Sequence, residues 1–133
     1  SDIFTIADHQ VAARLAAGRQ NYTTAARLLR EAVEVEDRLR YMEPPDWYLS
    51  SREALGGVLL SAGDPRAAEE VFRADLARNH RKGRALYGLQ ASLEAQGEKI
   101  AARLVQKGLD AAWANADVAL EPADIWWSRN NKN

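Results

Sequence analysis

The feature that most constrains the fold is an internal repetition with a period of 34 residues. A shift of 34 residues places seven residues on identical ones: Leu55 on Leu89, Leu59 on Leu93, Gly63 on Gly97, Ala67 on Ala101, Ala68 on Ala102, Val71 on Val105 and Ala77 on Ala111. A unit of this length cannot bury its apolar face alone, so copies must stack on one another to form a continuous core. The sequence therefore predicts a repeat protein.

An earlier and weaker copy fits after a shift of 43 residues. This shift places Ala25 on Ala68, and the leucines at 28 and 29 on Val71 and Phe72. The extra length is an insertion at about residues 40–48. We therefore divide a single domain, residues 1–133, into repeats at about 6–39, 49–82 and 83–116, followed by a C-terminal tail at 117–133.

Apolar residues recur at spacings of three and four along each copy, which predicts helices. Asp64 followed by Pro65 is typical of an N-cap and a first helical residue, and Gly63 and Gly97 stand where helices are expected to end. The predicted helices span about 3–18, 22–41, 47–62, 65–79, 83–96 and 98–115.

A 34-residue helix–turn–helix unit is the length of the tetratricopeptide repeat. The segment "REALGGVLLSAGDPRAAEEVFRADLARN" resembles that family through its Leu-Gly pair, Leu55 and Gly56, and through Leu59, Ala68 and Phe72. The part from "EPPDWYLSSREALG" to "EAQG" is also similar to a group of bacterial tetratricopeptide proteins, without a mechanism attached. The resemblance implies an all-α, right-handed α-solenoid of three helical hairpins and a protein–protein interaction scaffold.

In such an array the first helix of each pair lines a concave groove. The corresponding face of this chain predicts a mixed surface for a peptide or partner segment, formed by Gln10, Arg14, Glu53, Arg84, Tyr87 and Glu94. Tyr87 has a structural alternative, which is packing on the neighbouring hairpin. One subfamily clamps a C-terminal carboxylate with several basic and amide residues. Only Arg84 matches that clamp in kind, so this binding mode is not expected.

Several expected core positions hold polar residues. Arg52 and Asp75 are predicted to form a partly buried ion pair that fixes the helix register, because a lone buried charge is too costly to keep. The alternative is an acid–base pair in a pocket. Gln90 and Gln106 are expected to hydrogen-bond to each other, and His9 takes a core-facing place.

Composition argues against most chemical functions. The chain has no cysteine, and its two histidines are far apart, so no metal ligand set is predicted. A net charge of −1 does not favour nucleic acid as a partner. No apolar run approaches the length of a membrane span. We interpret the carboxylates at Glu34, Glu36 and Asp37 as a solvated helix face. We predict no catalytic residue, no metal and no cofactor. The compartment stays open, although a soluble cytoplasmic location is slightly favoured.

Two segments with aromatic residues lie outside the regular repeats, one in the insertion between the first two copies and one in the C-terminal tail. In "PPDW", Pro44 and Pro45 are expected to stop the second helix, and Asp46 to cap the third. In the tail, Trp126 and Trp127 are expected to fold back as a cap or to dock into another copy. The second interpretation gives the alternative function, an oligomerisation or structural module of a larger protein.

The basic run at residues 78–84 is interpreted as cations at a helix end and a solvated turn.

Overall fold

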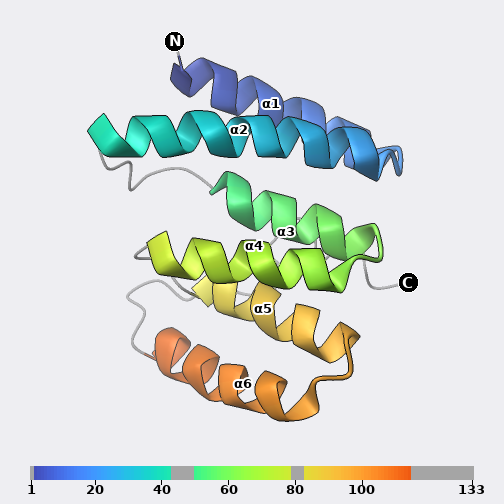
Figure 1. Ribbon diagram of the computed structural model, residues 1–133, viewed down its shortest axis with the longest axis vertical. Coiled ribbons are helices and arrows are strands. Elements are labelled where there is room, and N and C mark those ends of the chain that lie inside the picture. Colours follow the sequence, from blue (N-terminus) through green and yellow to red (C-terminus); the bar gives the residue numbers. More distant parts are fainter. Residues whose placement is uncertain (1, 43–49, 79–82, 115–133) are drawn as a thin grey trace.

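The computed structural model describes residues 2–42, 50–78 and 83–114, and all its regular elements are α-helices (Figure 1). In chain order the helices are α1 (Asp2–Gly18), α2 (Tyr22–Met42), α3 (Ser51–Ser61), α4 (Pro65–Arg78), α5 (Gly83–Ala95) and α6 (Lys99–Ala114). Within these ranges there is no strand. The predicted all-α class with about six helices is therefore confirmed. Residues 43–48 of the predicted insertion, the histidine at 80 and the two tail tryptophans lie outside the described residues.

Each helix packs against the helix that follows it, so α1 and α6 lie at opposite ends of the molecule (Figure 1). The odd-numbered helices also contact one another directly, α1 with α3 and α3 with α5. Among the described residues, the even-numbered helices make no contact of similar extent. The odd-numbered helices are thus closer together than the even-numbered ones.

The two turns inside the second and third hairpins have the same structure. Gly63 and Gly97 have φ angles of 82° and 78°, which residues with a Cβ adopt only at a cost. The next amide in each case donates back to a carbonyl five residues earlier, Asp64 to Leu59 and Glu98 to Leu93, both at 2.9 Å. Both helices therefore end in the motif that glycine favours, as the sequence predicts.

Asp64 also caps the helix that follows, because its Oδ1 accepts a hydrogen bond from the backbone N–H of Ala67 at 3.1 Å. Pro65 is the first residue of α4, where its missing N–H costs nothing. The start of α3 differs from its prediction. Ser50, not Asp46, is the N-cap of α3, and the helix begins at Ser51. The reason is local: the Ser50 hydroxyl accepts from the backbone N–H of Arg52, which a serine does well at this position.

The centre of the core is the ring of Phe72, which is completely buried. Phe72 lies on α4, and the tip of its ring lies against Gly56 of α3 and Gly88 of α5. A Cβ placed on Gly56 would lie 2.5 Å from Cζ of the ring, and one on Gly88 would lie 2.2 Å from the same atom. The absence of a side chain at both positions therefore makes room for the aromatic ring. The sequence pattern matches Gly56 to the Leu-Gly pair of the repeat, whereas it assigns Gly88 no place in the core.

Gly88→Ala is expected to destabilise the protein by about 1–3 kcal/mol, because the ring cannot retreat from the new methyl group without approaching Gly56. Gly108→Ala is the matched control. A Cβ at Gly108, in α6, meets only Leu86 Cδ2 at 4.0 Å, an ordinary contact. That change is expected to stabilise the helix by roughly 0.5–1 kcal/mol. Urea denaturation followed by circular dichroism measures both; equal effects of the same sign would contradict this account of Gly88.

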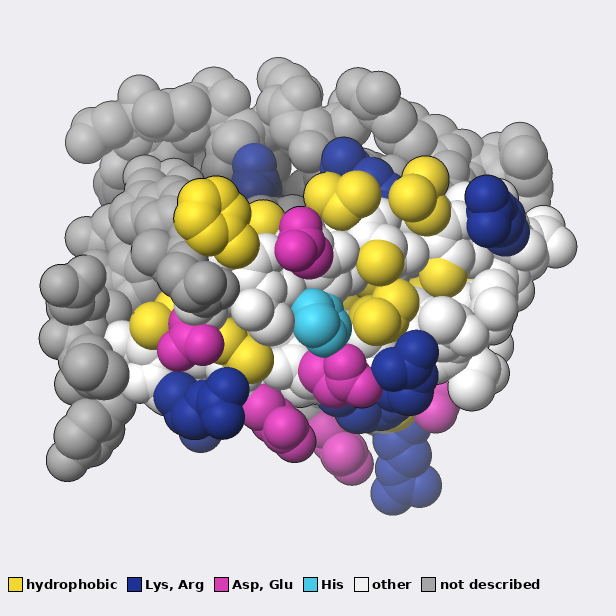
Figure 2. Space-filling model, turned by 90° about the horizontal axis from the view of Figure 1, so that it is seen from above, with side chains coloured by type: hydrophobic (Ala, Val, Ile, Leu, Met, Phe, Trp, Pro, Cys, Tyr) yellow, Lys and Arg dark blue, Asp and Glu magenta, His cyan; other side chains and the backbone are white. Residues whose placement is uncertain are grey.

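The end of the molecule formed by α1 carries exposed apolar side chains. Phe4, Val11 and Leu15 are all more than half exposed, and their spacing places them on one face of α1. Figure 2 shows hydrophobic side chains gathered on this end. The opposite face of α1 packs into the core through Ile6, Ala13 and Ala17. None of the described helices combines the length and hydropathy that a membrane span requires.

Candidate functional site

The predicted groove residues lie on α1, α3 and α5, of which α3 contacts the other two. On α1, Arg14 is exposed, while Gln10 is half-buried and its Nε2 donates to Ser51 Oγ of α3 at 3.0 Å. The hydrogen bond joins two first helices directly. Gln10 therefore holds α1 against α3, and Arg14, one turn further on, is an exposed residue of the same helix.

Glu53, predicted to be a surface residue of the groove, is only 9% exposed. It stands three residues after the N-cap Ser50, and its carboxylate accepts a hydrogen bond from the Ser50 backbone N–H. This bond is one half of a capping box, while the Ser50 hydroxyl accepts from the N–H of Arg52 rather than that of Glu53. The other carboxylate oxygen, Oε1, is buried and has no hydrogen-bond partner in the part of the chain that the structure describes. Glu53 thus has a structural role at the start of α3.

The electrostatic environment of Glu53 disfavours its charge. Burial raises its pKa from 4.5 to about 7, and the nearby carboxylate of Asp75 adds to the increase. The positive charge of Arg84 and the Ser50 N–H act in the opposite direction but do not cancel the increase. Arg84, on α5, is half-buried with a buried Nε. The positive charge of Arg84 thus acts on the buried Glu53 from the neighbouring helix, and neither side chain is fully exposed to a partner.

Tyr87 and Glu94 line a cavity of about 370 Å³ between α5 and α6. Its lining consists of one face of each helix: Tyr87, Gln90, Ala91 and Glu94 from α5, and Gln106, Leu109 and Asp110 from α6. Tyr87 is half-buried and packs against the hydrophobic core, as its structural alternative predicts. Glu94 is exposed at the edge of the cavity. Of the predicted groove residues, these two border a hollow that a partner side chain could enter.

The two glutamines in this cavity do not bond to each other, so that prediction is wrong. Gln90 Nε2 donates to Glu94 Oε1 at 3.1 Å, and Gln106 Nε2 donates to Asp110 Oδ1 at 2.7 Å. Each bond joins residues four apart on one helix, where side chains are natural neighbours. Each glutamine therefore bonds to a carboxylate of its own helix instead of to the glutamine on the opposite helix.

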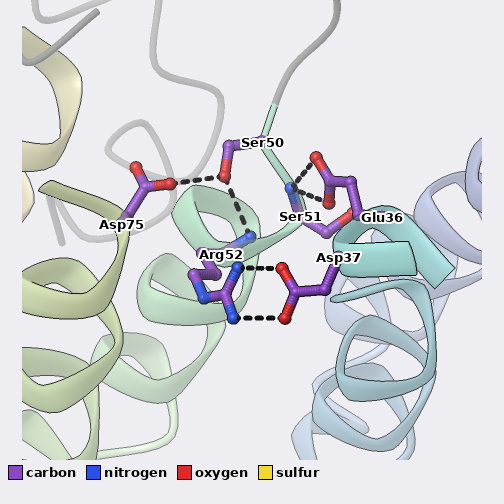
Figure 3. A network of polar contacts seen from close by, with 6 residues as sticks. All are labelled: Glu36, Asp37, Ser50, Ser51, Arg52 and Asp75. Carbon is purple, nitrogen blue, oxygen red and sulfur yellow. Dashed lines mark hydrogen bonds and ion pairs between the residues drawn. The ribbon is translucent and has the colours of Figure 1, made fainter. Parts of the chain in front are cut away.

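The predicted ion pair between Arg52 and Asp75 is also wrong (Figure 3). Arg52 instead forms a two-pronged ion pair with Asp37 of α2, with nitrogen–oxygen distances of 2.6 and 2.7 Å. Asp75 is completely buried, and its Oδ1 accepts from the Ser50 hydroxyl at 2.7 Å. The ion pair between Arg52 and Asp37 therefore links α3 of the second hairpin to α2 of the first, whereas the predicted pair would have linked α3 to α4 within the second hairpin.

The sequence-based interpretation of Glu34, Glu36 and Asp37 as a solvated helix face is wrong for Glu36. Its side chain is buried, and both carboxylate oxygens accept from the backbone N–H of Ser51, at 3.3 and 3.0 Å (Figure 3). Burial raises the pKa of Glu36, although the hydrogen bonds from Ser51 oppose the increase. Glu36 therefore satisfies a backbone donor in the first turn of α3, a group that has no partner within the helix.

His9, predicted to face the core, is half-buried on α1. Its Nε2 lies 2.8 Å from Glu31 Oε2 of α2, and its Nδ1 lies 2.8 Å from the backbone oxygen of Thr5. The arrangement fastens α1 to α2 inside the first hairpin. Within the described ranges, no cluster of three or more histidine, aspartate or glutamate side chains is placed to hold a metal ion.

A scan of protein-family models, a search of curated proteins and a search of solved structures each found no match to this chain. Functional inference therefore depends on the arrangement of its own residues.

The polar network could be predicted only partly from the sequence. The spacing of Ser50 and Glu53 is a capping-box signature that could have identified the true start of α3 and the structural role of Glu53. No local signal marks Glu36 or Asp37, because their partners lie 15 residues away across the insertion. Gly88 carries no such signal either, since its role depends on a ring from another helix.

Proposed function

We propose that this chain is a tetratricopeptide-like, right-handed α-solenoid of three hairpins that serves as a protein–protein interaction scaffold. In this proposal a peptide or partner segment lies along α1, α3 and α5, and the domain has no catalytic role and needs no cofactor. The 34-residue repetition and the matching turns at Gly63 and Gly97 support the repeat architecture.

The observation that carries the proposal is the direct contact among the three first helices. Because α3 contacts both α1 and α5, while the described parts of α2, α4 and α6 contact one another far less, the first helices are expected to lie on the inside of a curved array. The hydrogen bond from Gln10 to Ser51 joins α1 to α3, and the positive charge of Arg84, on α5, acts on the buried Glu53 of α3. A surface formed by adjacent helices suits an elongated ligand.

The predicted groove residues on this surface fall into two groups by their burial. Gln10, Glu53 and Arg84 are half-buried or buried and hold the helices in place. Arg14 and Glu94 are exposed and of opposite charge, and they lie on the first and third of the three helices. A partner segment that contacts both would therefore be oriented by its own charges.

Arg14→Glu is expected to weaken binding of a partner segment roughly tenfold, since an interfacial arginine often contributes that much to affinity. A peptide selected against this protein from a displayed random library serves as the probe, and fluorescence anisotropy gives its Kd. Arg30→Glu is the matched control, because Arg30 is also exposed but lies on α2, outside the proposed surface. Equal losses in the two variants, or a loss only in the control, would place the binding surface elsewhere.

A second candidate, an oligomerisation or structural module, is favoured by the exposed apolar face of α1 at Phe4, Val11 and Leu15. Its expected contact through Trp126 and Trp127 lies outside the described residues. Light scattering distinguishes the candidates, because this one requires a molar mass that is a multiple of 14.8 kDa.

A further inference from the structure

We propose that the cavity between α5 and α6 binds a cationic side chain of the partner segment, an arginine guanidinium group. The inference rests on the proposed function for its biological setting, since it assigns one residue type to the segment that the scaffold would hold. The cavity and its lining, however, are features of this chain alone, so the chemistry can be tested without a partner.

The cavity exists because the third hairpin lacks the aromatic residue that fills the second. In the 34-residue register, Gly56 and Phe72 correspond to Gln90 and Gln106. In the second hairpin the buried ring of Phe72 lies against Gly56 and occupies the space between its helices. In the third, the two glutamines bond along their own helices instead, and both line an open cavity of about 370 Å³. This volume lies within the range of small-ligand sites, roughly 300–1,000 Å³.

The charged groups at this cavity are hydrogen-bond acceptors. Glu94 and Asp110 bring two carboxylates to it from opposite helices, and none of its seven lining residues is a cation. The Nε2 groups of Gln90 and Gln106 are already directed to these carboxylates, one each. Every carboxylate and amide oxygen accepts hydrogen bonds only. In the described residues, neither Glu94 nor Asp110 forms an ion pair that would neutralise it.

A guanidinium group fits this arrangement better than the other common side-chain groups. It carries five N–H donors in one plane together with a positive charge, so it can bond to a carboxylate on each side. The apolar contribution of Ala91 and Leu109 to the lining suits the methylene stem of an arginine, which packs well against apolar surface. A carboxylate or phosphate would be repelled by Glu94 and Asp110.

Titration of the ¹⁵N-labelled protein with N-acetyl-arginine methylamide tests this inference by NMR. The expected result is a set of saturable shifts at the amides of residues 90–94 and 106–110. N-acetyl-citrulline methylamide, of similar shape but uncharged, is expected to bind at least about tenfold more weakly, because it lacks the charge-assisted bonds. Equal binding of the two compounds, or shifts centred outside these helices, would overturn the proposal.

Variants assign the binding to the cavity. The double change Glu94→Gln and Asp110→Asn keeps the size of the side chains and is expected to weaken arginine binding roughly tenfold. Glu98→Gln is the control, since Glu98 is exposed near the start of α6 but does not line the cavity. If the control lowers affinity as much as the double change, general charge rather than the cavity attracts the probe, and the proposal fails.

A second variant fills the cavity without altering its charges. Gln90→Gly combined with Gln106→Phe restores the glycine–phenylalanine pair of the second hairpin and is expected to abolish the shifts while helicity stays unchanged. If this variant is misfolded by circular dichroism, the charge variants above still decide the question. The Arg14→Glu change should leave the arginine titration unaffected. Failure of the peptide groove and failure of the cation site are therefore distinguishable outcomes.

Discussion

Replacing Phe72 with alanine is expected to lower the free energy of unfolding by about 3–5 kcal/mol, the largest effect that we predict for a single substitution. The ring is completely buried at the junction of α3, α4 and α5, and two glycines leave the space that it fills. Its removal would leave a cavity that the rigid helix backbones on either side cannot collapse into. Small domains have total stabilities of about 5–15 kcal/mol, so the loss is a large fraction of the whole.

The chain provides a matched control for this experiment, because it has only one other phenylalanine. Phe4, on α1, is 71% exposed, and Phe4→Ala is expected to change stability by less than about 0.5 kcal/mol. Urea denaturation followed by circular dichroism compares the two. Should Phe72→Ala fail to fold, Phe72→Leu, with a smaller expected loss, supplies the comparison. A Phe72 variant as stable as the Phe4 variant would show that the ring is not central to the core.

The second large effect concerns pH and Glu53. The pKa of Glu53 is raised to about 7 in the folded protein, against an ordinary value of 4.5. Between these two values the folded state holds a proton that the unfolded state has lost. The associated stability is therefore fully present below about pH 4.5, falls as the pH rises, and is gone above about pH 7. Since one pKa unit corresponds to about 1.4 kcal/mol, the loss is at most about 3.5 kcal/mol.

Glu53→Gln removes this titration and keeps the capping-box geometry, because glutamine is accepted at the same position. The variant is expected to match the natural protein near pH 4.5 and to be more stable above pH 7, where burying a charged Glu53 is unfavourable. Denaturation midpoints at intervals from about pH 4.5 to about pH 8.5 provide the measurement. Some pH dependence remains in the variant, since the pKa of Glu36 is raised as well.

Glu70→Gln is the control for this experiment. Glu70 is exposed on α4, and its replacement should leave the shape of the stability curve unchanged. If the stabilities of the Glu53→Gln variant and of the natural protein change in parallel with pH across the whole range, the pKa of Glu53 is not raised in the folded state. The burial argument for Glu53 would then be wrong.

Much of the helical framework could be predicted because its signals are local. A hydrophobic period, an N-capping Asp64 and glycines at 63 and 97 act within a few residues of where they stand, so their consequences can be read along the chain. The small residues of the core follow the repeat in the same way. Ala25, Ala68 and Ala102 occupy one position of the three copies, and all are buried.

The candidate site was predicted less completely. The sequence placed the predicted groove residues on three first helices, and of these residues Arg14 and Glu94 are exposed. It placed Glu53 on that surface as well, whereas the structure buries this side chain at the start of α3. The cavity beside Tyr87 arises from the glutamines at 90 and 106, which the sequence marked as departures from the pattern but paired incorrectly.

By itself the sequence determined the helical class, the repeat length, the turns and the residues that depart from the repeat. Only the tertiary structure decided which distant groups meet: Arg52 with Asp37, Glu36 with Ser51, and Phe72 with Gly88. The physical reason is the separation along the chain over which each kind of interaction acts. Capping and periodicity depend on neighbours along the chain, whereas a buried charge or ring takes whichever partner the packing of two distant helices brings within contact distance.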